Sequence, residues 1–234
     1  MHFHLLPGVD DGPATLDQSL RLAEAAVADG TGTVVCTPHV ELVEVGTLPD
    51  RVHELDASLR AAGIELSILA GGEVRVGAPM TAAELEIVAQ GPPGRRWLLL
   101  EAPLQEALFG DFHAYADELE AQGYGLLIAH PERCAPLLEP GGGLEHRLSR
   151  GARLQVNASS LTGAHGPRER AAGFALLASG RVSAIASDAH GADRPPLLSA
   201  ATTLLEQRGM DAAPMLRLSP AGQLPAINLV PAAG

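Results

Sequence analysis

Short apolar runs alternate with amphipathic segments of helix length along almost the whole chain. Each run is apolar over its full length, which is typical of strands that are buried on both faces of a parallel sheet. Expected strands lie in the opening residues and at 33–36, 66–70, 97–101, 126–130, 154–157 and 182–188. Seven such units predict an α/β protein with a parallel sheet. We expect closure into a barrel, because a barrel brings the carboxyl ends of its strands together.

Helix signals fill the intervals between these strands. Thr15 and Gln18 have the spacing of a capping box, and Gly30 is a typical helix stop. Further helices are expected near 82–89, 112–121, 168–178 and 197–207, and a Pro-rich tail begins at Pro214. No low-complexity linker interrupts the pattern. Residues 1–234 are therefore expected to form one domain, at a size where barrels still fold as a unit.

Side chains of metal-ligand type follow the ends of most of the expected strands. They are His39, Glu73, Glu101, His130, Asp188 and His190. The opening strand adds His2 and His4, which lie two residues apart and so point to the same face. Imidazole and carboxylate groups suit zinc and other divalent transition ions. Because these ligands outnumber those that one tetrahedral ion needs, we expect two or three ions, with Glu73 as a bridging carboxylate.

Such a cluster lowers the pKa of a bridging water and polarises the group under attack, which indicates hydrolysis. Two arginines bear on the substrate, because Arg133 follows His130 and Arg194 follows His190 by only a few residues. A guanidinium group binds phosphate oxygens in pairs and stabilises a transferring phosphoryl group. Arg133 and Arg194 are therefore candidate phosphate-binding residues, although loop arginines also pair with nearby carboxylates.

Other polar residues have weaker interpretations. Asn157 closes the sixth expected strand, and its side chain could orient a ligand or the phosphate, or could cap the next loop. Four further histidines fall on expected helices or loops and are interpreted as surface residues: His53, His113, His146 and His165.

Composition excludes several other functions. All 16 basic residues are arginine, so Schiff-base chemistry, a phosphate-binding loop lysine and a carboxylated lysine ligand are excluded. The net charge of −12 argues against binding to nucleic acid or to an anionic membrane, because both partners are also negatively charged. No segment has the length of a membrane span or the pattern of a signal peptide, which predicts a cytoplasmic protein without membrane insertion.

The two cysteines, Cys36 and Cys134, are too few for a disulfide framework and fit a reducing compartment. A cysteine phosphatase needs an arginine six residues after its thiolate, and Leu42 and Pro140 occupy those positions. A thiol nucleophile is therefore rejected.

Several motifs occur in a characteristic order: H-F-H-L-L-P-G-V-D-D-G, C-T-P-H, G-G-E, L-L-E-A-P, I-A-H-P-E-R, Q-V-N-A-S-S and I-A-S-D-A-H. In this order they resemble the polymerase and histidinol phosphatase (PHP) superfamily over nearly the whole chain. The greatest similarity is to its bacterial manganese-dependent tyrosine-protein phosphatases of capsule and exopolysaccharide operons. The segment Val40-Glu41-Leu42 departs from this pattern, because relatives commonly continue with a further His or Arg. We expect this segment near the substrate mouth.

The resemblance implies a distorted seven-stranded β/α barrel that carries three metal ions at its carboxyl face. It implies manganese, with magnesium, iron or zinc as alternatives. The implied ligand sets are His2, His4, Glu73 and Asp188, then Glu73, Glu101 and His130, then Asp11, His39 and His190. Asp10 would be a turn or supporting residue, and Arg133 and Arg194 would bind the substrate phosphate. Asp11 or His190 would protonate the leaving group.

The implied function is hydrolysis of phosphotyrosine, with a tyrosine kinase of polysaccharide export as the protein partner. Histidinol phosphate or another small phosphomonoester is an alternative substrate. An amidohydrolase-type barrel also begins with H-x-H, but it predicts an eighth strand and often a bridging lysine. A non-catalytic metal-binding module is the third interpretation, and a homo-oligomer remains open.

Overall fold

The computed structural model describes residues 1–216 and contains an α/β fold with two parallel sheets. The smaller sheet pairs β1 (Thr33–Cys36) with β2 (Ser67–Ala70). The larger sheet has the order β3-β4-β5-β6-β7. Its strands are β3 (Glu73–Val74), β4 (Trp97–Glu101), β5 (Gly125–Ala129), β6 (Arg153–Asn157) and β7 (Val182–Ala186). The predicted parallel sheet is therefore confirmed, and β7 is buried at every residue.

The opening residues differ from the predicted first strand. Phe3 forms only isolated parallel bridges, one to Cys36 and one to Ala189, and a further bridge joins His39 to Glu73. Within residues 1–216 the regular pairing thus forms two sheets joined by bridges, and no continuous closed barrel of strands. The opening segment therefore has no regular ladder of strand hydrogen bonds and is held in place by single bridges to its neighbours.

The predicted strand over 66–70 and the following Glu73 belong to two different strands, because Gly71 and Gly72 separate them. A Cβ at Gly71 would lie 2.5 Å from Val35 Cγ1, and a Cβ at Gly72 would lie 2.7 Å from Val40 Cγ1. Glycine is needed here because only its bare backbone can approach these side chains so closely. The chain consequently leaves one sheet and enters the other within two residues, which carries Glu73 to the second sheet.

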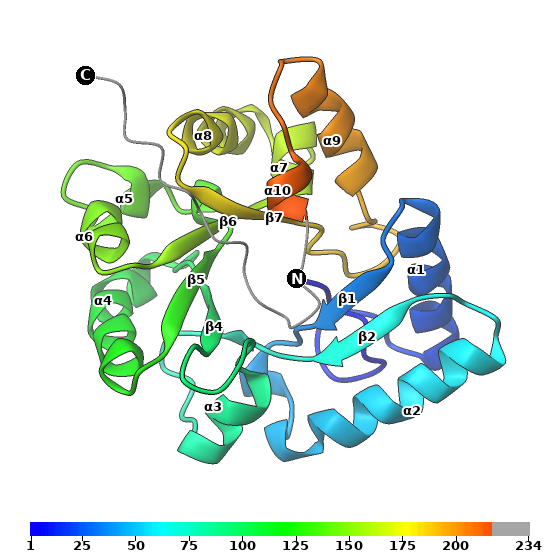
Figure 1. The fold of residues 1–234 in the computed structure, drawn as a ribbon. Helices are drawn as coiled ribbons and strands as arrows, with labels where there is room; N and C mark the ends of the chain where they lie inside the picture. The colour runs from blue at the N-terminus through cyan, green and yellow to red at the C-terminus, as the bar shows by residue number, and fades with distance from the viewer. Residues whose placement is uncertain (217–234) are drawn as a thin grey trace.

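Helices surround the strands, as Figure 1 shows. Their bounds are α1 (Leu16–Ala28), α2 (Leu48–Ala61), α3 (Ala82–Val88), α4 (Glu106–Ala121), α5 (Ala135–Leu138), α6 (Leu144–Ser149), α7 (Ala158–Thr162), α8 (Pro167–Ala178), α9 (Leu198–Glu206) and α10 (Ala213–Leu216). Most predicted helices are confirmed to within one or two residues, but α4 begins earlier than residue 112. From residue 217 on, the predicted Pro-rich tail lies outside the described residues.

The predicted start of α1 is confirmed in part. Thr15 Oγ1 accepts a hydrogen bond from Gln18 N (3.3 Å), as an N-cap should. Gln18 Oε1, however, accepts from Ala14 N (2.7 Å) rather than from Thr15 N, so the reciprocal half of the box is displaced by one residue. Within residues 1–216, no helix is both long enough and apolar enough to span a bilayer.

Candidate metal centre

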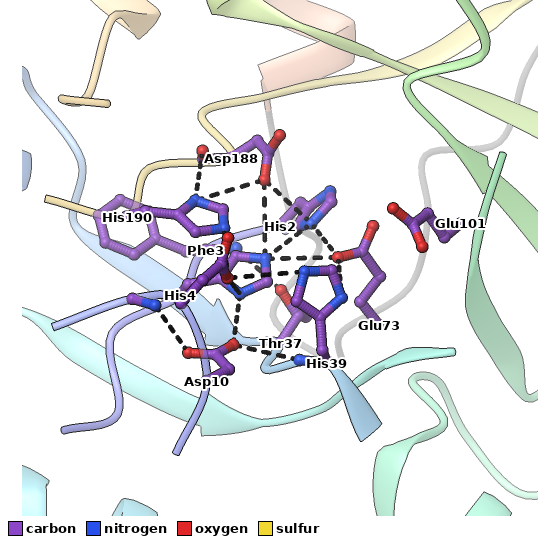
Figure 2. Close-up of polar contacts among 12 residues, drawn as sticks. His2, Phe3, His4, Asp10, Thr37, His39, Glu73, Glu101, Asp188 and His190 are labelled. Atoms are coloured by element: carbon purple, nitrogen blue, oxygen red, sulfur yellow. Dashed lines mark hydrogen bonds and ion pairs between the residues drawn. The ribbon is translucent and has the colours of Figure 1, made fainter. Parts of the chain in front are cut away.

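The opening segment is fixed between the ends of β1 and β7. Phe3 O accepts a hydrogen bond from Thr37 N (2.9 Å), and Phe3 N donates to Thr37 Oγ1 (2.9 Å). On the other side His4 N donates to Ala189 O (3.0 Å), and His2 O accepts from Asp188 N (2.9 Å). Phe3 packs into the core, so the two histidines on either side of it point together to the opposite face. Figure 2 shows both imidazoles facing Glu73 and Asp188.

Hydrogen bonds determine which nitrogen of each imidazole carries the proton. His4 Nδ1 lies 2.6 Å from Asp10 Oδ2, and His2 Nδ1 lies 2.9 Å from Gln155 Oε1. Since both partners are acceptors, Nδ1 is the donor in each ring, and each Nε2 carries a lone pair. Yet the two Nε2 atoms lie only 3.2 Å apart. In neutral rings two lone pairs in such close contact repel each other, and a proton or a metal cation between them relieves the repulsion.

Two carboxylates complete this first group. His2 Nε2 lies 3.2 Å from both Glu73 Oε2 and Asp188 Oδ1. His4 Nε2 lies 3.4 Å from Glu73 Oε2 and 3.6 Å from Asp188 Oδ1. Ligand atoms around one tetrahedral ion with bonds of about 2.0–2.2 Å lie about 3.3–3.6 Å from one another. Each of these separations fits ligands of a divalent transition ion, and the ligand atoms within 4.8 Å of one another form two overlapping groups, His2 with His4 and Glu73, and His2 with His130 and Asp188.

Glu73 faces a second group through its other oxygen. Glu73 Oε1 lies 3.0 Å from His130 Nε2, and the Oε1 side of the carboxylate faces Glu101 in Figure 2. Ligand atoms of Glu73, Glu101 and His130 lie within 4.8 Å of one another. Burial, together with the nearby Glu73 carboxylate, raises the pKa of Glu101 to about 7. With one oxygen on each side, Glu73 has the geometry of a bridging ligand.

A third group lies at the outer edge. Asp11 Oδ1 is 3.2 Å from His190 Nε2 and 3.6 Å from His39 Nε2, and His4 completes the group. His39 Nδ1 is also 3.2 Å from Glu73 Oε2. Nevertheless, His39 Nδ1 and His190 Nε2 are buried atoms without a hydrogen-bond partner in the described chain. Buried polar atoms are normally satisfied, so ligand atoms that converge without bonding to each other fit a cation among them.

Burial disfavours charge on these side chains, and at His4 and Glu73 neighbouring groups of opposite charge outweigh it. Burial alone would lower the pKa of His4, but the hydrogen bond to Asp10 and the carboxylates of Glu73 and Asp188 raise it to about 10. Burial would likewise raise the pKa of Glu73, whereas the nearby His2 and the hydrogen bond from His130 hold it well below its usual range. The carboxylates thus require positive charge, which protons or metal ions can supply.

The backbone is unusual at two of these positions. His130 and Asp188 have φ values of 36° and 50°, and they are the non-glycine residues with positive φ in the described chain. A left-handed conformation costs free energy for most residues with a Cβ, and such residues concentrate at functional sites. His130 directly follows β5 and Asp188 lies two residues after the end of β7, and at both positions the sharp backbone turn directs the side chain into the cluster.

Sequence reasoning missed Gln155, which supports the cluster from behind. Gln155 Nε2 donates to Asn157 Oδ1 (2.7 Å), and Asn157 Nδ2 donates to Asp188 Oδ2 (2.6 Å). A chain of hydrogen bonds therefore runs from His2 through these two amides to Asp188. The Asn157 side chain therefore orients a ligand-type residue, which was one of its two interpretations. It makes no capping hydrogen bond to α7, which excludes the other. The sequence pattern gave no signal for Gln155, because this residue lies within its strand rather than at the end of it.

This chain of hydrogen bonds leads to a first prediction. Replacing Gln155 by Leu is expected to weaken metal binding about 10- to 100-fold, because the acceptor that fixes the His2 ring is lost. Chelator competition would measure the affinity. Gln90→Leu is the matched control, since Gln90 Nε2 bonds to Ala70 O (2.7 Å) outside the cluster. An equal loss of affinity in both variants would contradict the supporting role of Gln155.

The two candidate phosphate-binding arginines lie beside the cluster. Arg194 Nη2 is 3.1 Å from Asp188 Oδ2 and Arg194 Nη1 is 3.3 Å from Asp11 Oδ2. Arg133 Nη1 is 3.5 Å from Asp188 Oδ2. Both guanidinium groups line the same cavity of about 160 Å³ as the ligand-type side chains, and both are partly exposed. They can therefore meet an anion that enters the cavity.

The segment after His39 forms a short 3₁₀ helix, Val40–Leu42. Its Glu41 is paired with Arg75 (Oε1 to Nη1, 3.2 Å), and Arg75 Nε also lies 3.7 Å from Glu101 Oε2. Arg75 thus offsets the acidity that this departure from the family pattern brings. Sequence reasoning did not identify Arg75, because the pair joins residues 34 positions apart.

Of the four histidines predicted to lie at the surface, His53 and His146 are exposed. The prediction that His113 lies at the surface is wrong, because its side chain is half-buried and its Nε2 lies 3.0 Å from Gly142 O. His165 is also wrong, because it is half-buried and its Nδ1 lies 3.0 Å from Ser160 Oγ. Burial raises the pKa of the Cys36 thiol to about 12, which agrees with the rejection of a thiol nucleophile.

A parallel α/β fold with histidines and carboxylates gathered at its strand ends defines a class, that of the metal-dependent hydrolase folds. The model of the family "Capsular polysaccharide synthesis, CpsB/CapC" matches residues 1–223. The chain belongs to this family. Tyrosine-protein phosphatase YwqE of Bacillus subtilis is 30% identical over 198 residues, which cover 81% of this chain and 76% of YwqE. Tyrosine-protein phosphatase CpsB of Streptococcus agalactiae is 27% identical over 222 residues, or 88% of each chain.

Solved structures agree with this assignment. One from a study of YwqE from Bacillus subtilis and CpsB from Streptococcus pneumoniae, described as metal-dependent tyrosine phosphatases, is 28% identical to this chain with a TM-score of 0.75. The match covers 91% of this chain and 88% of the chain in that structure. An organophosphorus hydrolase from Deinococcus radiodurans is 17% identical with a TM-score of 0.56, and the match covers 96% of this chain and 92% of that chain. That second likeness concerns the fold alone.

Proposed function

We propose that this chain is a metal-dependent protein-tyrosine phosphatase. The observation that carries the proposal is the convergence of nine histidine and carboxylate side chains, seven of which line one cavity together with two arginines, in a member of a family with such phosphatases. Its substrate would be a phosphotyrosine protein of polysaccharide synthesis, and we favour the tyrosine-rich tail of a kinase that controls export. The family description supports this choice of process.

We propose three ions, held by the three ligand sets that the resemblance implies. The spacing around His2 and His4, the two-sided Glu73 and the orphaned atoms of His39 and His190 support this arrangement. Manganese is the favoured metal, with magnesium, iron or zinc as alternatives. When bound, the ions would act as Lewis acids that activate a water for attack on phosphorus.

The protein's own side chains would do the rest of the work. Arg133 and Arg194 would bind the phosphate oxygens and neutralise the charge that spreads over them in the transition state. Asp11 or His190, whose Oδ1 and Nε2 atoms lie 3.2 Å apart at the outer edge of the cluster, would protonate the leaving phenolate oxygen. Asp10 would keep His4 in the tautomer that presents Nε2 to the cavity.

We also propose that residues 1–234 form one phosphatase domain and that the bridges of Phe3 and His39 close its two sheets into a distorted barrel. These bridges lie between neighbouring strand ends, which supports closure. Cytoplasmic location is part of the proposal, because two free, buried thiols fit a reducing compartment.

A comparison of substrates tests the proposed activity. With manganese present, kcat/KM for a phosphotyrosine peptide is expected to exceed that for histidinol phosphate by at least about tenfold, or roughly 1.4 kcal/mol. Steady-state kinetics on both substrates would measure the ratio. A preference for histidinol phosphate would instead support a small-molecule phosphatase, and hydrolysis of amides alone would overturn phosphoryl transfer.

A further inference from the structure

A second, larger cavity adjoins the candidate metal centre. It has a volume of about 620 Å³ and lies between α1 and the segment 190–196. It shares Asp11, His190 and Arg194 with the smaller cavity of the cluster, so the two cavities adjoin at these three side chains. The smaller cavity, at about 160 Å³, has room for a phosphoryl group but not for a peptide. Ligand pockets commonly measure roughly 300–1,000 Å³, which includes the larger cavity.

One face of α1 forms a wall of this larger cavity. Gln18, Arg21, Leu22 and Ala25 line it, and their spacing of three, four and seven residues places them on the same side of the helix. Leu22 and Ala25 offer apolar surface. Arg21 pairs only with Asp17 among its described contacts, and both side chains are more than half exposed. Exposed pairs of this kind contribute little stability, so a ligand can replace the partner of Arg21 at small cost.

The opposite wall is a rigid turn. His190 N donates to Arg194 O (3.0 Å) and Arg194 N donates to Gly191 O (3.2 Å), so the segment that presents Arg194 closes on itself. Pro195 and Pro196 follow directly and line the cavity. Proline rings fix the backbone and offer flat apolar surface. A cavity with one helical wall and one rigid wall is formed before any ligand arrives, which lowers the entropic cost of binding.

We propose that this larger cavity binds the tyrosine ring and the flanking peptide residues of the substrate while its phosphate lies in the smaller cavity. The inference rests on the proposed phosphatase function and adds to it the location of the leaving group. Asp11, His190 and Arg194 line both cavities and so form the border between them. A tyrosine whose phosphate lies in the smaller cavity would place its ring across this border, against Leu22, Ala25 and the prolines.

Filling the cavity tests the inference. Ala25→Trp projects a large ring from α1 into the cavity, and Val27→Trp is the matched control, because Val27 lies on the same helix but does not line the cavity. Both variants would be assayed with manganese on a phosphotyrosine peptide and on p-nitrophenyl phosphate. The inhibition constant of inorganic phosphate would report on the smaller cavity, and thermal unfolding would report on the fold.

In Ala25→Trp the ratio of kcat/KM for the peptide to that for p-nitrophenyl phosphate is expected to fall about tenfold, the effect of a filled pocket. Phosphate inhibition should stay at the wild-type value, and Val27→Trp should leave the ratio unchanged. If Ala25→Trp does not fold, Ala25→Leu replaces it and should lower the ratio by a smaller factor.

Unchanged kcat/KM values for both esters in a folded Ala25 variant, or an equal fall in both tryptophan variants, would overturn the inference. So would a fall in the ratio caused by Leu42→Ala but not by Ala25→Trp, because Leu42 is exposed, does not line the larger cavity and would mark a different peptide path. Failure of the wild-type protein to hydrolyse either phosphate ester would instead contradict the proposed function itself.

Discussion

Replacing Glu73 by Ala is expected to abolish phosphatase activity, with a loss on the order of 10³ or more in kcat, because the side chain faces two ligand groups at once. Its Oε2 faces His2, His4 and His39, and its Oε1 faces His130. Hydrolysis of p-nitrophenyl phosphate with manganese present would measure the loss, and elemental analysis would show fewer bound ions per chain. Exhaustive chelation of the wild-type protein should reproduce the loss, and added manganese should restore activity.

Two further variants separate this effect from misfolding. Glu73→Gln keeps the volume of the buried side chain but removes its charge, so it should also lose metal and activity. Glu65→Ala, at an exposed glutamate ahead of β2, should leave both unchanged. Activity that survives both Glu73→Ala and chelation would show that the proposed metal-dependent mechanism is wrong.

Removing the Arg194 guanidinium is expected to lower kcat/KM by about 10²–10³, or roughly 2.7–4 kcal/mol, which is typical for the loss of one donor to transition-state charge. Arg194→Lys keeps the charge but loses the paired geometry, so it should recover only part of the activity. Arg133→Ala should act in the same direction. The measurements are steady-state kinetics and inhibition by inorganic phosphate, which should weaken in parallel.

Metal content decides between two roles for these arginines. Arg194 contacts Asp11 and Asp188 as well as the cavity, so its loss could act through the ligands. If it binds substrate, Arg194→Ala should keep the full complement of ions. A loss of ions together with activity would instead assign Arg194 to the support of Asp188. Arg168→Ala, at an exposed position on α8, is the neutral control.

The ligand-type residues were predictable because parallel strands end at the same edge. Residues as distant in sequence as Glu73, His130 and Asp188 could therefore be expected in one place from the strand pattern alone. The helices were predictable for a similar reason, since caps and glycine stops act within a few residues. The capping residue Thr15 is an example.

What escaped prediction depends on contacts between side chains that no local pattern records. Gln155 bonds to a histidine 153 residues away, and Arg75 pairs with Glu41 across two loops. The break between β2 and β3 depends on how closely Val35 and Val40 approach Gly71 and Gly72. Similarly, the partly buried positions of His113 and His165 depend on their contacts with Gly142 O and with Ser160 Oγ.

The attachment of the opening segment sets the order in which the centre can form during synthesis. Phe3 is bridged on one side to Cys36 and on the other to Ala189, and His2 O accepts its hydrogen bond from Asp188 N. The first two histidines leave the ribosome long before the residues that orient them. Contacts of such large sequence separation form slowly, because a long loop must close first. The metal centre is therefore completed only when nearly all of the strands exist, so truncated chains carry its first two histidines without the residues that complete the site.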